Sequence, residues 1–163
     1  AARMVRDFDT ISICLSKGLG APVGSVLVGD AATIAEAHRW RKMFGGGMRQ
    51  AGVLAAAGLY ALENNIDRLA KDHARARRLA EAVDAMEAYS IDLGAVQSNM
   101  VYINCEKGRA KALVDNLSQQ GVDVLDLEQG VDYGDVSTVR AVVHLHVTDE
   151  DIDRAIAAFD AAQ

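Results

Sequence analysis

The stretch Ser12-Ile-Cys-Leu-Ser-Lys17-Gly-Leu-Gly-Ala-Pro-Val-Gly24 carries the strongest signal in this sequence of 163 residues. A short β-type run stops at Lys17, and a glycine-rich turn with the only proline follows it. Lysine is almost never buried unpaired, so an amine at the end of a buried strand needs a reason. One explanation is Schiff-base chemistry, because a desolvated amine attacks aldehydes. The other is a lysine whose side chain extends from the strand end into solvent, and spacing alone favours this second explanation. The order GxxxxGK[ST] of a Walker-type phosphate loop is absent.

The residues around this stretch predict a mixed α/β chain. Strands are expected over 11–16 and 23–29, and Asp30 can cap a helix over 31–43 that the glycines 45–47 end. A second helix, over 48–64, is small and apolar nearly all round, which is typical of a buried helix. A long amphipathic helix follows within 65–90. After it we expect, in order, strand 99–105, helix 108–120, strands 122–127 and 138–147, and helix 149–162 with Thr148 as its cap.

The strand expected over 138–147 contains an arginine. Alternation places Arg140, Val142, His144 and His146 on one face and the apolar residues between them on the other. An arginine on the polar face of such a strand fits the edge of a binding site, and a surface salt bridge is the competing interpretation. We predict no metal site, because no third ligand stands at a convincing spacing from the two histidines.

Composition and charge exclude several classes of protein. The formal charge is −6, which argues against nucleic-acid binding. Residues 1–80 carry 12 Lys and Arg against 7 Asp and Glu, whereas residues 81–163 carry 5 against 16. An acidic solvated surface on the second half explains most of this difference, and the sharper interpretation is that the first half holds cations for anionic ligands. No apolar stretch approaches the roughly 20 residues of a membrane span. Cys14 and Cys105 lie in apolar runs, and we interpret them as reduced core residues of a cytoplasmic protein.

Three motifs, in order and spacing, resemble a known enzyme family. Ser16-Lys17-Gly-Leu-Gly-Ala-Pro-Val-Gly-Ser25, Arg39-Trp-Arg-Lys-Met43 and Gly45-Gly-Gly-Met-Arg-Gln50 are similar to segments of the low-specificity L-threonine aldolases, which use pyridoxal 5′-phosphate (PLP). The segment Val139–Val147 resembles the strand near the C-terminus of that family. The resemblance extends over most of this chain and covers only the later half of a family member.

The resemblance implies roles for four residues. Lys17 matches the catalytic lysine that binds PLP as an aldimine, and Arg140 matches the arginine that grips the substrate α-carboxylate. Lys42 matches a catalytic lysine that acts through water on the substrate hydroxyl. Arg49 matches an arginine of the cofactor region, reaching the phosphate. For Lys42 and Arg49, solvated charges at helix ends are an equally good interpretation.

The resemblance also implies the fold and the activity. The fold is α/β of the PLP-dependent transferase-like type (fold type I): residues 1–64 form the end of the large PLP-binding domain, 65–90 a long connecting helix, and 91–163 a small C-terminal β-α-β-β-α domain. The implied activity is cleavage of L-threonine or L-allo-threonine to glycine and acetaldehyde by a homotetramer. The strands 11–16 and 23–29 are too few for the sheet that a buried helix needs. We therefore expect a preceding part of the polypeptide to supply the remaining cofactor ligands, and this chain by itself to be inactive.

Two alternatives remain open. Another fold type I enzyme, a β-eliminating lyase or a serine hydroxymethyltransferase-like enzyme, would share the same lysine and arginine. A non-catalytic assembly module would instead use the apolar helix over 48–64 to bind a partner chain.

Overall fold

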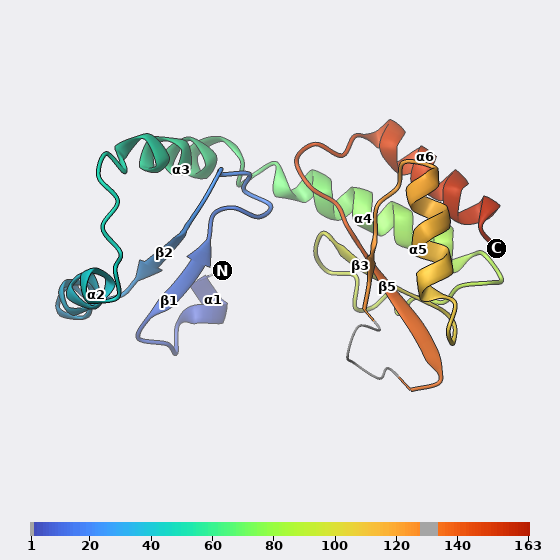
Figure 1. Cartoon of the computed structure of the whole chain (residues 1–163), viewed down its shortest axis with the longest axis horizontal. Coiled ribbons are helices and arrows are strands. Elements are labelled where there is room, and N and C mark those ends of the chain that lie inside the picture. Colours follow the sequence, from blue (N-terminus) through green and yellow to red (C-terminus); the bar gives the residue numbers. More distant parts are fainter. Residues whose placement is uncertain (1, 128–133) are drawn as a thin grey trace. The chain divides into compact units, whose positions relative to one another are not determined.

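The computed structural model describes residues 2–127 and 134–163. The chain forms two compact units, Ala1–Asp67 and Arg68–Gln163 (Figure 1). Each unit contains its own sheet and its own cluster of buried apolar residues. The α/β class that the sequence predicts is therefore confirmed.

The first unit is a β-hairpin with three helices. Its elements are α1 (Ala2–Val5), β1 (Ile11–Cys14), β2 (Ser25–Val28), α2 (Ala31–Met43) and α3 (Gly52–Asn64). Strands β1 and β2 pair antiparallel, with Ile11 opposite Val28 and Cys14 opposite Ser25. Asp30 caps α2 as expected, because its Oδ1 accepts a hydrogen bond of 2.8 Å from the N–H of Thr33.

The prediction that the apolar helix is buried is wrong for the described residues. Only Gly58 and Ala61 of α3 are buried, while Leu59 is 59% and Tyr60 65% exposed. The physical reason is the small sheet: two short strands offer only a cluster of Leu15, Leu19 and Ala21 for α3 to pack against, and Ala61 is its contact there. The other faces of this apolar helix remain uncovered by the residues described.

The second unit packs three helices on one face of a three-stranded sheet. Its elements are α4 (Leu69–Asp84), β3 (Met100–Glu106), α5 (Ala110–Gln119), β4 (Leu125–Asp126), β5 (Val136–Val142) and α6 (Asp149–Ala161). The sheet order is β3-β5-β4, antiparallel throughout, so β5 is the central strand. This confirms the β-α-β-β-α order expected after the amphipathic helix.

The helices and the sheet of the second unit share one core. Alternate residues of β3 (Val101, Ile103 and Cys105) are buried, as the two-residue period of a strand requires. They meet apolar residues of α4, α5 and α6, among which Leu117 and Phe159 are fully buried. The opposite face of the sheet carries the half-buried Arg140 and the partly exposed Tyr102.

Two sequence expectations about this unit have different outcomes. Thr148 caps α6 in a reciprocal capping box with Asp151, as expected. The strand expected to continue to residue 147 instead ends at Val142, so His144 and His146 lie in the connection to α6 and do not share a strand face with Arg140. Strand β5 ends at Val142 because its partner β3 begins at Met100, which lies opposite Val142.

Candidate functional site

Lys17 lies in a tight turn directly after β1. The N–H of Gly20 donates a hydrogen bond of 2.8 Å to the carbonyl of Lys17, and the φ of Gly20 is +72°, a conformation that glycine adopts without strain. Leu15, two residues earlier, donates its N–H to Gly24 at 2.9 Å and accepts one from Ala21 at 3.1 Å. Both ends of the turn are thus hydrogen-bonded, which fixes the backbone from which the lysine projects.

This turn is also attached to α3. The buried side chain of Leu15 packs so closely on the helix that a Cβ atom at Gly58 would stand 3.2 Å from its Cδ1. At the end of α3, the side-chain amide of Asn65 donates a hydrogen bond of 2.7 Å to the carbonyl of Leu19. The apolar helix therefore holds the lysine turn, which gives a residue-level reason for glycine at position 58.

The side chain of Lys17 is exposed to solvent. The dry pocket that Schiff-base chemistry requires is not formed around it by the described residues. The nearby apolar side chains Ile13 and Val23 are 42% and 47% exposed, so they offer surface that a further group or chain segment would cover. Within this unit the described residues therefore leave the amine in contact with solvent.

Cys14 next to this turn corrects a sequence expectation. It is exposed rather than part of the core, whereas Cys105 is buried, as expected. The pKa of the Cys14 thiol is lowered, chiefly by its hydrogen bond with Ser16, and the charge of Lys17 contributes in the same direction. The apolar run around Cys14 belongs to an exposed hairpin, which the sequence pattern could not distinguish from a buried strand.

Lys42 occupies the last turn of α2, where the glycine run folds back over the helix end. Gly45 donates its N–H to the carbonyl of Lys42 at 3.1 Å, and Gly46 donates to the carbonyl of Arg41 at 2.7 Å. A Cβ atom at Gly47 would stand 2.6 Å from the Nζ of Lys42. The glycine run thus leaves room for this exposed amine, and a larger residue at position 47 would move it.

Arg49 lies in the connection between the glycine run and α3. It is exposed, and no hydrogen bond or ion pair joins it to another residue within 2–127 or 134–163. The next residue, Gln50, has a φ of +54°, in the left-handed region that non-glycine residues seldom adopt. The loop that carries the guanidinium therefore has a defined backbone conformation.

Arg140 stands at the middle of the central strand of the second unit. Tyr102 lies opposite it on β3 and Leu125 opposite it on β4, and these flanking side chains are 46% and 47% exposed. The Nε of Arg140 is buried without a hydrogen-bond partner, and its guanidinium makes no ion pair with the residues that the structure describes. The surface salt bridge considered as the competing interpretation is thus not formed with any acid that lies within 2–127 or 134–163.

Most arginines of the second unit are paired, in contrast to Arg140. In α4, Arg75 binds Asp149 at 2.8 Å and Arg78 binds Asp153. Asp149 holds the pKa of Arg75 above its usual value through this hydrogen bond. Two of the 12 lysines and arginines of residues 1–80 are therefore paired with acids of α6 and are not available to an anionic ligand.

The four predicted residues are distributed over both units. Lys17, Lys42 and Arg49 belong to the first unit and Arg140 to the second. Across the two described ranges, no hydrogen bond or ion pair joins any two of them. Sequence reasoning missed Tyr102 as a neighbour of Arg140. Its signal was the alternation of strand 99–105, which puts Tyr102 on the face opposite the buried residues.

Two findings on the described residues complete the site's description. None of the helices has the length and the apolar character of a membrane span. No group of three His, Cys, Asp or Glu side chains within these residues is arranged as a metal site.

Comparison with known proteins gives consistent results. Residues 1–106 match the family model of the beta-eliminating lyases. Low-specificity L-threonine aldolase 1 of Arabidopsis thaliana is 39% identical over 98% of this chain, which covers 44% of that protein. The low specificity L-threonine aldolase of Escherichia coli O157:H7 is 43% identical over 88% of the chain and is covered to 40%. A serine palmitoyltransferase structure from Sphingomonas wittichii, 21% identical, superimposes with a TM-score of 0.79, covering 99% of this chain and 41% of that one. The chain thus spans less than half the length of these relatives.

Proposed function

This chain belongs to the beta-eliminating lyase family, and we propose that its protein is a PLP-dependent aldolase. The proposed reaction breaks the Cα–Cβ bond of L-threonine or L-allo-threonine and yields glycine and acetaldehyde. The similarity to named low-specificity L-threonine aldolases along nearly the whole chain supports this choice.

The donor groups of the chain fit such a cofactor and substrate. PLP supplies the electron sink that stabilises a carbanion at Cα. Lys17 provides the primary amine that binds the aldehyde group, from a turn whose backbone is fixed at both ends. Arg49, which pairs with none of the residues described, provides a guanidinium for the phosphate, and the amine of Lys42 exchanges a proton through water with the substrate hydroxyl.

The observation that carries the proposal is the orphaned guanidinium of Arg140. Its Nε is buried without a partner, which is costly unless another group completes its hydrogen bonds. A carboxylate does so with two parallel hydrogen bonds. Because Tyr102 and Leu125 border the guanidinium on both adjacent strands, a bound α-carboxylate is confined between them. Arg140 thereby orients the substrate so that the bond to be broken is correctly aligned.

We further propose that the site is completed by polypeptide outside these 163 residues. The exposure of Lys17 and of α3 supports this, since both need covering apolar surface. The division into a large-domain segment 1–64, a connecting helix and a small domain 91–163 belongs to the same proposal. A homotetramer, with sites shared between subunits, would supply part of the cover. A cytoplasmic location belongs to the proposal as well, since the two cysteines do not form the disulfide framework of small secreted domains.

The test is a substrate panel with the PLP-loaded protein that contains this chain. Threonine, allo-threonine, serine and tryptophan are assayed side by side, with the Lys17→Ala variant as the matched control. We expect acetaldehyde from threonine or allo-threonine with the unaltered protein, and loss of both activity and the visible cofactor absorption in the variant. Cleavage of serine or tryptophan alone would assign the protein to another reaction of fold type I.

One observation favours a second candidate, a non-catalytic assembly module. The helix α3 exposes Leu59 and Tyr60 in a unit that buries few of its own residues. A module of this kind would bind a partner chain tightly through α3. Mixing PLP with the protein that contains this chain distinguishes the two, because such a module would give no visible cofactor absorption under any condition.

A further inference from the structure

The tyrosine opposite Arg140 carries a second polar group without a partner. Tyr102 and Arg140 are paired across β3 and β5, and both lie on the face of the sheet opposite the core. Neither the hydroxyl of Tyr102 nor the guanidinium of Arg140 makes a hydrogen bond or an ion pair within residues 2–127 and 134–163. Tyr102 is 46% exposed, so a ligand can reach its side chain. Two donor groups that are free to bind a ligand thus stand next to each other on adjacent strands.

The two residues form the closer kind of cross-strand pair. Val143 donates its N–H to the carbonyl of Asn99 at 2.9 Å, which makes these two residues a hydrogen-bonded pair. Because hydrogen-bonded and non-hydrogen-bonded pairs alternate along an antiparallel ladder, Tyr102 and Arg140 form a non-hydrogen-bonded pair. The Cα atoms of such a pair are about 4.5 Å apart, against about 5.5 Å in a hydrogen-bonded pair. Leu125 is in a hydrogen-bonded pair with Arg140, so Tyr102 is the nearer of its two neighbours.

Side-chain hydrogen bonds join the two strands on either side of this pair. The Nδ2 of Asn99 donates to the carbonyl of Val143 at 2.7 Å, and the Oγ1 of Thr138 donates to the Oδ1 of Asn104 at 2.8 Å. Both bonds are partly buried, and the paired tyrosine and arginine lie between them along the ladder. The backbone from which these two side chains project is therefore held in a fixed register.

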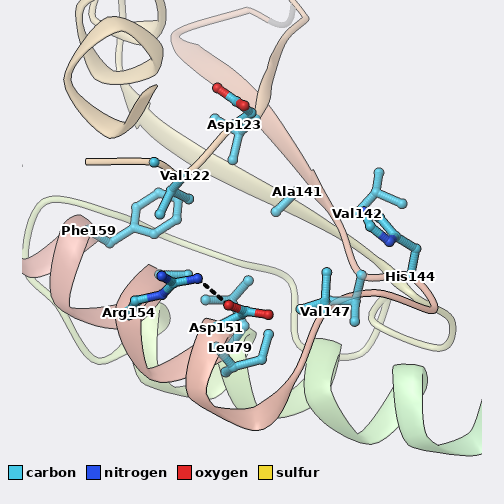
Figure 2. A pocket seen from close by; sticks show the side chains of 15 residues that line it. Leu79, Val122, Asp123, Ala141, Val142, His144, Val147, Asp151, Arg154 and Phe159 are labelled. Carbon is cyan, nitrogen blue, oxygen red and sulfur yellow. Dashed lines mark hydrogen bonds and ion pairs between the residues drawn. The ribbon is translucent and has the colours of Figure 1, made fainter. Parts of the chain in front are cut away.

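A cavity of the second unit lies on the other face of β5. Figure 2 shows this cavity, of about 310 Å³, bordered by residues of β5 and of α6. Ala141 and Val143 line it from the core side of the strand, whereas Tyr102 and Arg140 are not among its lining residues. Since side chains alternate between the two faces of a strand, a ligand bound to the guanidinium lies on the face opposite this cavity.

A carboxylate is a ligand that both donor groups can bind together. A guanidinium donates two parallel hydrogen bonds to the two carboxylate oxygens. Each oxygen keeps a further lone pair, which can accept a hydrogen bond from a phenolic hydroxyl. Tyrosine and arginine side chains are of similar length, so their polar ends reach a similar height above the sheet.

We propose that Tyr102 binds the substrate α-carboxylate together with Arg140. This inference rests on the proposed function, in which Arg140 holds that carboxylate. The Tyr102 hydroxyl donates a hydrogen bond to one carboxylate oxygen while the guanidinium donates to both. A third hydrogen bond from a second strand restricts the rotation of the carboxylate and so helps to orient the bond that is broken.

The test compares glycine with methylamine as ligands of the PLP-loaded protein that contains this chain. Both ligands have a primary amine, and only glycine has a carboxylate. The dissociation constant of each is measured from the change in visible cofactor absorption, so the readout does not depend on turnover. Tyr102→Phe should weaken glycine binding about tenfold, the magnitude of one hydrogen bond to a charged group, and leave methylamine binding unchanged.

A second tyrosine provides the matched control. The hydroxyl of Tyr89 donates to the carbonyl of Phe159 at 3.2 Å inside the core, so Tyr89→Phe should lower stability and leave the affinity for both ligands unchanged. Unaltered glycine affinity in Tyr102→Phe, or an equal loss for glycine and methylamine, would overturn this inference and leave the proposed function standing. Absence of any absorption change with glycine in the unaltered protein would overturn the proposed function, and the inference with it.

Discussion

A Cβ atom added at Gly47 would stand 2.6 Å from the Nζ of Lys42, whereas one added at Gly46 would stand 2.8 Å from the carbonyl oxygen of Arg41. The first contact is with the far end of a flexible side chain and the second is with backbone. We therefore predict that Gly46→Ala costs about 1–3 kcal/mol of unfolding free energy and Gly47→Ala less than about 1 kcal/mol. Denaturant unfolding of both variants checks this order.

The same pair of variants tests the role of Lys42. In Gly47→Ala the protein stays folded but the Lys42 amine is displaced, so the aldolase rate should fall although stability hardly changes. An unchanged rate would mean that the position of this amine does not matter to the reaction, and Lys42 would be a solvated charge at a helix end.

The packing of Leu15 against Gly58 predicts a contrast within α3. A Cβ atom at Gly58 meets Leu15, whereas one at Gly52 meets nothing within 4 Å. Replacing a helical glycine by alanine ordinarily adds about 0.5–1 kcal/mol. We expect this gain for Gly52→Ala and a smaller gain or a loss for Gly58→Ala, because Leu15 must shift and the Lys17 turn moves with it. Equal unfolding midpoints for the two variants would show that α3 does not hold the turn.

Arg140 is expected to affect substrate binding far more than stability. Its guanidinium makes no ion pair with the described residues, so Arg140→Ala should leave the unfolding free energy nearly unchanged. The variant should raise the KM for threonine about tenfold or more, because a charged hydrogen bond to the carboxylate is lost. Arg140→Lys should recover only part of this loss, since a lysine cannot pair through two parallel bonds. As a control, Arg78→Ala removes an arginine paired with Asp153 and should leave KM unchanged.

The cap of α6 predicts how stability depends on pH. The pKa of Asp151 is lowered, chiefly by the hydrogen bond from the backbone of Thr148. Because the folded pKa lies below the unfolded value, the stabilisation is present above the unfolded pKa and is lost as pH falls through the folded pKa. Unfolding measured between about pH 5 and pH 3 should show a steeper decline for the unaltered chain than for Asp151→Asn. Parallel curves would contradict this role of the cap.

The sequence predicted elements best where a local signal fixed them. Asp30 and Thr148 are capping residues, and the helices they begin start where expected. The end of β5 was missed because the alternation of apolar residues continues through Val147, while the strand stops where β3 begins at Met100. Pairing between distant segments decides such an end, and no local pattern reports it.

The sequence named candidate site residues, whose roles stay predictions, but not their surroundings. Motif spacing singled out Lys17 and Arg140, yet the exposure of Lys17 and the orphaned Nε of Arg140 depend on which segments pack nearby. The apolar pattern of α3 is typical of a helix that packs against other residues. It does not say whether those residues belong to the same unit, which is why burial was predicted and exposure is observed.

The central claim is that the Lys17 amine binds the aldehyde group of PLP. Reducing the PLP-loaded protein with borohydride fixes the cofactor on the amine that holds it, and peptide mass mapping then identifies the modified lysine. We predict the pyridoxyl mass on the peptide containing Lys17 and its absence from the peptide containing Lys42. A modification at any other lysine, or none at saturating PLP, would contradict the account.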